Sequence, residues 1–355
     1  MPKRATSSRP TYRWKTRLRG VTNAILPSHT TRPNPFVAGN KVFSSIFAPG
    51  AVCAVDKETG TLRWMMKLDS YAGSAVLLKD SSLYATSCRT LYALDPDTGA
   101  IRWEFTPETE PGEWIYSQPA VRGGLVFIGD RQGYFHCLNG KTGKPIWRRL
   151  TSRAGNNQVN ATALIVGKRV ITANNDGAVI CYAVQTGKTV WRRKLAAGCV
   201  GELLLLRSRV ILGARSLYGL NLRTGAVDLV LTFPKKVVKS LTVAGSRIAV
   251  ALGTDFQSEP SAWNEASAFA GELVMVERGR ELVRRSLEGM PSLRTCTQTG
   301  LVFASEYSHM SVIDPSDGSV VRVRRGEIAL PDRSGGHLYG LTRGGTLFAE
   351  PMQTH

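Results

Sequence analysis

The amino-acid sequence predicts an all-β protein, an eight-bladed β-propeller built from four-stranded antiparallel blades. Three observations predict this fold. A Thr-Gly turn between two apolar runs recurs along the chain, four of its copies end in a tryptophan at intervals of 39, 44 and 44 residues, and a further short apolar run precedes every copy. Four short strands in a period of about 40 residues are typical of one propeller blade.

The clearest copies share an apolar strand, a turn with Thr-Gly and a second strand. They are VCAVDKETGTLRW (52–64), LYALDPDTGAIRW (91–103), FHCLNGKTGKPIW (135–147) and ICYAVQTGKTVW (180–191), followed by the weaker LYGLNLRTGAVDL (217–229) and VIDPSDGSVVRV (312–323). A further copy, GELVMVERGRELVRRSL (271–287), has Arg-Gly in place of Thr-Gly. Glycine supplies the positive φ that such turns need. The turn glycines are Gly60, Gly99, Gly143, Gly187, Gly225 and Gly318.

The short β patterns that precede the copies bring the count of blades to eight. They are KVFSSIF (41–47), SLYATS (82–87), GLVFIG (124–129), RVITAN (169–174), RVILGA (209–214), RIAVAL (247–252), GLVFAS (300–305) and HLYGLT (337–342). Runs of this length that are rich in Val, Ile, Leu and Tyr and end in turn residues are strands rather than helices. One more apolar segment lies upstream of each run, which gives four strands per blade.

The two ends of the chain are predicted to complete one blade together. The last copy ends at GTLFAEPMQTH and provides only three strands, whereas TYRWKTRL (11–18) matches the Trp-bearing outer strands LRWMMKL and VWRRKL. We expect residues 11–18 to form the outer strand of the last blade, because closure removes the free blade interface of an open ring. The chain then divides into a basic tail at 1–10 and one propeller at 11–355, with a loop insertion at 254–271.

With these repeats, the chain resembles the quinoprotein (PQQ-type) β-propellers over nearly its whole length. In that family the repeat tryptophan packs between blades against the turn of a neighbour. The resemblance implies this structural role for Trp14, Trp64, Trp103, Trp147 and Trp191. Three later copies lack the tryptophan, so the resemblance leaves the packing between those blades open.

The family includes PQQ-dependent alcohol dehydrogenases and non-catalytic eight-bladed proteins, such as the lipoprotein that assists outer-membrane protein assembly. The dehydrogenases are longer and carry a disulfide between neighbouring cysteines, an acidic Ca²⁺ site and a catalytic Asp. The six cysteines here are scattered, at Cys53, Cys88, Cys137, Cys181, Cys199 and Cys296, and the five histidines show no metal-ligand spacing. We therefore expect no catalytic residue, no metal, no cofactor and no small-molecule substrate, and we expect reduced cysteines in the core.

The net charge points to a second property. Lys and Arg outnumber Asp and Glu by 46 to 27, which gives a formal charge of +19, and residues 141–250 hold 19 basic and three acidic residues. Such a sector attracts nucleic acid, an anionic lipid surface or an acidic protein. Charged outer strands also prevent edge-to-edge aggregation, and the sequence leaves both interpretations open. The candidate contact residues are Arg148, Arg149, Arg192, Arg193, Lys235, Lys236 and Lys239.

Two insertions that interrupt the repeat are further candidates for contact. TPETEPGEWIYS (106–117) carries Trp114, and TDFQSEPSAWNEASAFAG (254–271) carries Trp263. Loops on a rigid ring concentrate binding function, and tryptophan is a frequent interface anchor. Trp263 is therefore either a contact residue or part of a plug that folds back. The polar run at 156–160 either holds a polar ligand or is a solvated loop.

These features together predict a non-catalytic scaffold that binds other protein subunits through its basic sector and projecting loops. The alternatives are a nucleic-acid or ribonucleoprotein subunit that binds an anionic partner, and a PQQ-dependent dehydrogenase-like enzyme. No run of 18 apolar residues indicates a transmembrane helix. The basic start has no apolar stretch behind it, which predicts a cytoplasmic protein, and its Arg-rich, acid-free composition leaves the mitochondrial matrix open for a eukaryotic source.

Overall fold

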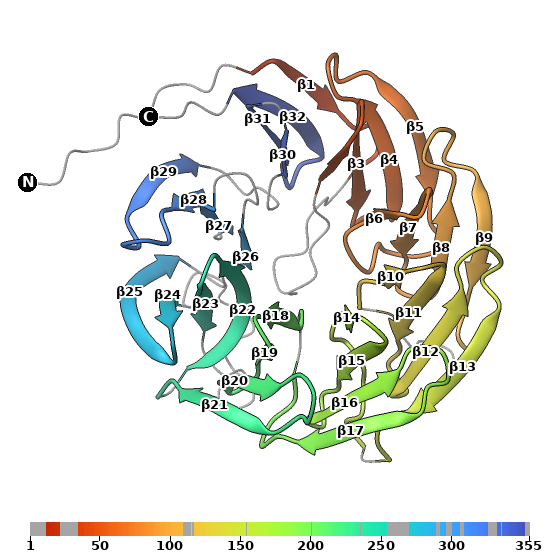
Figure 1. The fold of residues 1–355 in the computed structure, drawn as a ribbon. Coiled ribbons are helices and arrows are strands. Elements are labelled where there is room, and N and C mark those ends of the chain that lie inside the picture. The colour runs from red at the N-terminus through yellow and green to blue at the C-terminus, as the bar shows by residue number, and fades with distance from the viewer. Residues whose placement is uncertain are drawn as a thin grey trace, which may run out of the picture.

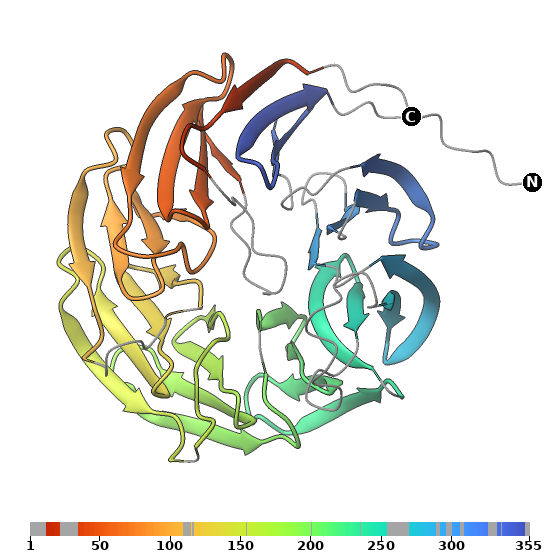
Figure 2. The ribbon, with the colours of Figure 1, turned by 180° about the vertical axis from the view of Figure 1, so that it is seen from behind.

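The predicted eight-bladed propeller is confirmed by the computed structural model of the chain. The structure describes residues 12–21, 35–108, 115, 117–153, 155–199, 201–234, 236–253, 270–288, 292–295, 300–305, 309–325, 332–334 and 336–351. Within these residues the strands form eight four-stranded antiparallel sheets. The sheets stand around a central axis as blades, seen from the two sides of the ring in Figures 1 and 2.

Blades 1 to 4 follow one another along the chain, and in each blade the strands run in sequence order from the axis to the rim (Figure 1). Blade 1 consists of β2 (Phe36–Ala38), β3 (Lys41–Ile46), β4 (Ala51–Asp56) and β5 (Leu62–Lys67), and blade 2 of β6 (Leu77–Lys79), β7 (Ser82–Thr86), β8 (Leu91–Leu94) and β9 (Ile101–Phe105). Blade 3 consists of β10 (Ala120–Arg122), β11 (Leu125–Gly129), β12 (Tyr134–Asn139) and β13 (Pro145–Leu150), and blade 4 of β14 (Leu164–Val166), β15 (Arg169–Ala173), β16 (Ala178–Ala183) and β17 (Thr189–Lys194).

Blades 5 to 8 complete the circle, and the last of them takes its outer strand from the start of the chain. Blade 5 consists of β18 (Leu204–Leu206), β19 (Arg209–Gly213), β20 (Ser216–Asn221) and β21 (Val227–Thr232), and blade 6 of β22 (Val237–Ala244), β23 (Arg247–Gly253), β24 (Ala270–Glu277) and β25 (Arg280–Glu288). Blade 7 consists of β26 (Ser292–Thr295), β27 (Val302–Ser305), β28 (His309–Ile313) and β29 (Val320–Arg325), and blade 8 of β30 (Asp332–Ser334), β31 (His337–Leu341), β32 (Thr346–Pro351) and β1 (Trp14–Arg17).

The predicted closure of the ring is confirmed by the pairing of β1 with β32. Trp14 lies opposite Ala349, the backbone N–H of Arg13 donates to the Ala349 carbonyl at 2.8 Å, and the N–H of Leu18 donates to the Gly345 carbonyl at 2.9 Å. The first described strand is therefore the rim of the last blade. It lies beside blade 1 in both views of the ring (Figures 1 and 2).

The register of each blade places two of its turns at one end. In blade 3, Arg122 lies opposite Leu125, Leu125 opposite Asn139, and Leu138 opposite Pro145. The turn between the first and second strands and the Thr-Gly turn between the third and fourth strands therefore lie side by side. We call this side of the ring the turn face. The connections between blades and those between second and third strands lie on the opposite face.

The core lies between neighbouring blades and is made by the two middle strands of each sheet. In β12, Phe135, Cys137 and Leu138 are fully buried, whereas the outer strand β13 is largely exposed. The five described cysteines are free and buried, which agrees with their predicted place in the core, and Cys296 lies outside the described residues. Burial raises the pKa of the Cys53 thiol to about 12 and that of Cys181 to about 11. Such thiols are neutral and unreactive at ordinary pH.

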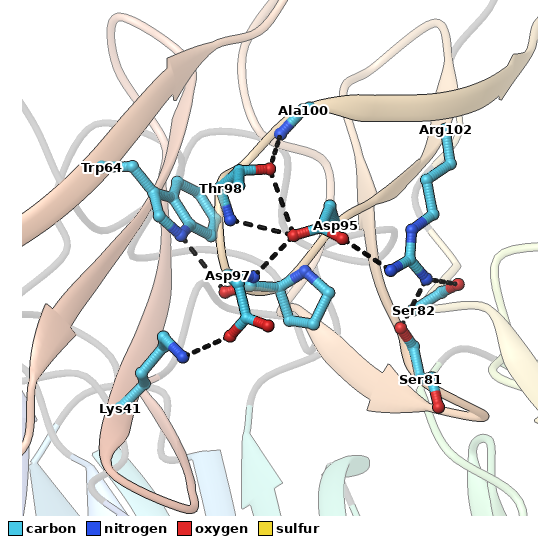
Figure 3. Close-up of polar contacts among 10 residues, drawn as sticks. Lys41, Trp64, Ser81, Ser82, Asp95, Asp97, Thr98, Ala100 and Arg102 are labelled. Carbon is cyan, nitrogen blue, oxygen red and sulfur yellow. Dashed lines mark hydrogen bonds and ion pairs between the residues drawn. The ribbon is translucent and has the colours of Figure 1, made fainter.

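The repeat tryptophans lie in the seams between blades. Trp64 of blade 1 donates its indole N–H to the Pro96 carbonyl of blade 2 at 3.2 Å (Figure 3). The Trp64 ring lies over Gly99. The same bond joins Trp14 to Lys57 at 2.8 Å, Trp103 to Gly140 at 2.9 Å, Trp147 to Val184 at 3.0 Å and Trp191 to Leu222 at 3.1 Å. A Cβ at the turn glycine below each ring would lie within 2.7 Å of the indole, and every one of these glycines has a positive φ.

Two of the blades without a repeat tryptophan use an aliphatic side chain in the same seam. Leu229 of blade 5 lies over Gly279 of blade 6, and Val283 of blade 6 lies over Gly318 of blade 7. The residue opposite a repeat tryptophan is small, as at Ala54, and Gly219 lies opposite Leu229, whereas the larger Met275 lies opposite Val283. The seam thus continues through two of the three blades whose packing the sequence left open.

The acidic residue before the Thr-Gly turn of blades 1 and 2, Asp56 or Asp95, is a structural cap. In Figure 3, one carboxylate oxygen of Asp95 accepts the backbone N–H groups of Asp97 and Thr98, both at 2.9 Å, and the other accepts a bond from Arg102 at 2.7 Å. Lys41 of blade 1 reaches across the seam to Asp97 at 2.5 Å. The Arg102 guanidinium and then the two N–H groups lower the pKa of Asp95 to about 2.

This lowered pKa predicts a specific acid response. At a pH between the ordinary pKa of about 3.9 and the lower pKa of the folded protein, Asp95 binds a proton in the unfolded chain only. The stability that ionised Asp95 contributes is therefore fully present above pH ~3.9 and is lost as the pH falls through the pKa of the folded protein. We expect Asp95→Asn to lose less stability than the wild type between neutral pH and pH 2. Unfolding midpoints measured against pH test this, with Glu104→Gln as the control for an exposed acid on the same blade. Parallel curves for Asp95→Asn and wild type would contradict it.

Candidate functional site

A cavity of about 310 Å³ lies at the axis, where innermost strands from several blades meet. Its charged lining residues are Glu202 before blade 5, Lys239 of blade 6 and Arg294 of blade 7, and Gln118 adds an amide. The Glu202 side chain is exposed to solvent, but it lies inside the ring with protein atoms around it. The resulting desolvation raises the pKa of the Glu202 carboxyl, and the positive charge of Arg294 opposes this rise. The arrangement suits a small polar group better than an apolar ligand.

The cavity residues do not fit a Ca²⁺-bound quinone. Calcium takes six to eight oxygen ligands, several of them usually carboxylates, whereas Glu202 is the one carboxylate that lines the cavity among the described residues. Across the same residues, no group of three or more His, Cys, Asp and Glu side chains could hold a metal ion.

Arg149 and Arg193, both predicted contact residues, belong to the seams. Each follows a repeat tryptophan by two residues, and so lies on the same side of its outer strand. Arg149 donates to the carbonyls of Gly187 at 2.9 Å and Thr186 at 2.8 Å, and Arg193 donates to the carbonyl of Thr224 at 3.1 Å. These arginines therefore bind the Thr-Gly turn of the next blade beside the tryptophan.

The other two predicted arginines also have intramolecular partners. Arg148 forms an ion pair with Glu108 at 3.4 Å and lies over the ring of Tyr134 at 4.8 Å from its centroid. Arg192 donates to the Thr151 carbonyl. All four arginines thus bond from the rim of blades 3 and 4 to neighbouring parts of the ring, and a role for them in binding a partner stays a prediction.

The remaining predicted contacts separate in space. Lys239 lines the central cavity, and Lys236 lies in the connection before β22. Their neighbour Lys235 lies outside the described residues, as do Trp114 and Trp263 in the two insertions. All three lysines are candidate contact residues from the sequence, but the strand that begins at Val237 carries Lys239 to the axis.

The polar run at 156–160 forms a bonded network on the face opposite the turn face. The Gln158 side-chain oxygen accepts bonds from the amides of Asn160 and Asn175, both at 3.3 Å, and Asn157 donates to the Ser152 carbonyl at 2.8 Å. Within the described part of the chain, the side-chain oxygens of Asn160 and Asn175 are buried without a hydrogen bond. Buried acceptors of this kind are ordinarily met by ordered water.

A basic surface that the sequence analysis missed lies on the turn face of blades 3 to 5. We call it the basic turn patch, and its exposed members are Arg122, Lys141, Lys144, Lys168, Lys188, Arg207 and Arg223. An alignment of the turns contains a signal for it. The second residue after the cap is Glu58 in blade 1 and Asp97 in blade 2, but Lys141 in blade 3 and Arg223 in blade 5.

The fold matches solved propellers along nearly its whole length. A computationally designed protein, Ika8, superposes with a TM-score of 0.71 at 17% identity, covering 94% of this chain and 98% of the design. BamB from Moraxella catarrhalis superposes with a TM-score of 0.56 at 17% identity, covering 96% and 99% of the two chains. At such identities these likenesses show the fold alone. Among the described residues, no helix has the length and apolar character needed to cross a membrane.

Curated relatives match shorter segments. The outer membrane protein assembly factor BamB of Legionella pneumophila (strain Paris) is 28% identical over 120 residues, which are 34% of this chain and 30% of the relative. A quinoprotein ethanol dehydrogenase of Pseudomonas putida is 32% identical over 91 residues, 25% of this chain and 14% of the enzyme. The matches therefore span less than a third of these relatives. The family described as outer membrane protein assembly factor BamB matches residues 11–228 and 88–324, and with its closed ring of PQQ-type repeats the chain belongs to this family.

Proposed function

We propose that the protein is a non-catalytic scaffold that holds protein subunits of a macromolecular assembly. The observation that carries the proposal is the family match across residues 11–324, because the matched family and two of the curated relatives are named as assembly factors. The structural roles of the repeat residues agree with the proposal that the protein is non-catalytic. The carboxylates of Asp56 and Asp95 cap turns, and the indoles fill seams, so neither set is available for chemistry.

The proposed contacts with protein partners are the two insertions and the connection before β22. Trp114, Trp263 and Lys235 are proposed from the sequence as contact residues, together with Lys236. An interface tryptophan typically contributes about 2 kcal/mol or more, which is about thirtyfold in affinity. A cytoplasmic location stays a prediction, and fractionation of cells that produce the native protein tests it.

The test is the size and composition of the complex that the full chain forms in its own cells. We expect the tagged chain to elute in a stoichiometric protein complex, with chemical crosslinks from the segments around Trp114 and Trp263. The double substitution Trp114→Ala and Trp263→Ala is expected to weaken partner binding by at least about thirtyfold. Val230→Ala, a change at an exposed apolar residue of β21, is the matched control and should leave recovery unchanged. Elution as a free monomer would contradict the proposal.

The dehydrogenase alternative is tested separately because quinoprotein enzymes are among the relatives. The purified chain is mixed with PQQ, Ca²⁺ and a primary alcohol, and reduction of an artificial electron acceptor is followed. We expect no alcohol-dependent reduction, since the described residues provide no acidic set for the metal. Alcohol-dependent turnover that disappears without PQQ would favour the enzyme.

A further inference from the structure

The basic turn patch consists of cations without partners in the described chain. Its seven side chains come from the turns of blades 3, 4 and 5, all seven are exposed, and none forms an ion pair or side-chain hydrogen bond among the described residues. The turns lie in contact within each blade. The N–H of Gly140 donates to the Gly124 carbonyl at 2.7 Å, and that of Val184 to the Lys168 carbonyl at 3.0 Å. Between blades, Trp147 of blade 3 donates to the Val184 carbonyl of blade 4 at 3.0 Å, and Arg169 of blade 4 donates to the Arg223 carbonyl of blade 5 at 3.0 Å. The turns that carry the patch therefore adjoin one another across three neighbouring blades.

The same turns in blades 1 and 2 are neutralised. Asp56 binds Arg63 at 2.6 Å, Asp95 binds Arg102 at 2.7 Å, and Lys41 binds Asp97 at 2.5 Å. Blades 3 and 4 lack acidic residues in these turns, and Asp228 of blade 5 is bonded to Arg209 at 2.9 Å. Asp80 of blade 2 meets the edge of the patch, where it accepts the N–H of Gly124 at 3.2 Å. The excess of positive charge is thus confined to one part of the turn face.

The fold does not need this charge. Asn139 and Asn221 cap their turns as the aspartates do, accepting backbone N–H groups at 2.9 to 3.1 Å, and the turn after Ala183 forms without a side-chain cap. Protection of strand edges does not explain the patch either, because its cations are in turns or at their ends rather than along a free edge. Positive charges that lie close together repel one another and oppose folding. A bound anionic ligand would offset this repulsion and so would explain why the cations are concentrated here.

We propose that the basic turn patch binds the sugar–phosphate backbone of a nucleic-acid duplex, independently of the scaffold function. Lys, Arg, Thr and backbone N–H groups are the usual phosphate ligands, and each Thr-Gly turn adds an exposed threonine: Thr142, Thr186 and Thr224. The turns contain no aromatic residue on which unpaired bases could stack. They also show no exposed large apolar residue at their tips, as a membrane-inserting surface or the core of a protein interface would.

The test is binding of the full chain to a labelled duplex, measured by fluorescence anisotropy between ~50 and ~200 mM salt. Seven phosphate contacts predict a slope of log affinity against log salt of about −6. The substitutions Lys141→Gln, Lys188→Gln and Arg223→Gln, one in each blade, should together reduce that slope by about 3 and the affinity at least about tenfold. Their side chains bond to nothing in the described chain, so the variant should unfold at the wild-type midpoint.

The matched control removes the same charge from the opposite face. Lys67, Arg89 and Arg153 are exposed there, at the far end of β5 and in connections on that side. Their replacement by glutamine should change the affinity less than about twofold. Equal losses in the two triple variants would overturn the proposal, because net charge alone would then explain binding. So would failure to bind any duplex at low salt, or binding to anionic phosphatidylserine vesicles in its place. Comparing DNA and RNA duplexes of the same sequence shows which nucleic acid the patch prefers. Binding of either duplex supports the proposal that the patch binds phosphate backbones.

Discussion

Replacing Trp14 by alanine is expected to lower the free energy of unfolding by about 3–5 kcal/mol, the usual cost of removing a buried tryptophan. Trp14 is 8% exposed and packs in one cluster with Val42 and Ile46 of blade 1 and with Tyr339 and Leu347 of blade 8. Its indole bond to the Lys57 carbonyl is the same bond that the other repeat tryptophans make from blade 1 to blade 5. The substitution therefore weakens the anchoring of β1, whose pairing with β32 closes the ring through hydrogen bonds between the two ends of the chain.

The measurement that separates closure from general loss of packing is hydrogen exchange on Trp14→Ala and Trp103→Ala. Trp103 is buried to the same 8% in the seam between blades 2 and 3, each of which consists of four consecutive strands. Both variants should lose similar stability in denaturant, but only Trp14→Ala should expose the N–H groups of Arg13 and Leu18, which bond to blade 8. A loss below about 1 kcal/mol with these amides still protected would mean that β1 does not hold the ring closed.

The ring could be predicted because its seams use residues that are rare and positionally fixed. A tryptophan and a positive-φ glycine in register reveal a blade even where the strands are short, and Trp14 revealed the shared last blade in the same way. Leu229 and Val283 fill equivalent seams but could not be recognised, because aliphatic residues occur in every strand. Their place became visible only from the glycines beneath them.

The candidate site was harder to predict for a physical reason. Charge counted along the sequence does not separate a cation that bonds to the next blade from one that faces solvent. Arg149 was therefore grouped with residues of the basic sector, although its position two residues after Trp147 places it in the seam. The cavity trio of Glu202, Lys239 and Arg294 comes from three different blades. Such long-range groupings leave no local pattern in the sequence.

Substitution of Gly143 by alanine is expected to destabilise the protein by about 3 kcal/mol, from a left-handed backbone that costs about 1–2 kcal/mol and from overpacking that costs about 1–3 kcal/mol. Its φ is +70°, and an added Cβ would lie 2.6 Å from the Trp103 ring. Gly123 in the same blade is the matched control. Its φ is +58°, but an added Cβ there would meet nothing within 4 Å, so only the backbone cost should remain.

The packing part of this cost should depend on the tryptophan. Leucine fills the equivalent seam at Leu229, so Trp103→Leu should make room for a methyl group at Gly143. In a double-mutant cycle measured by urea unfolding, the double variant Trp103→Leu, Gly143→Ala should be more stable than the sum of the single losses by about 1 kcal/mol or more. Additive losses, or equal losses for the alanines at positions 143 and 123, would show that the close approach of indole and glycine does not constrain the turn. The repeat would then need glycine for its backbone conformation alone, and the regular pairing of tryptophan with glycine across the seams would have no energetic basis.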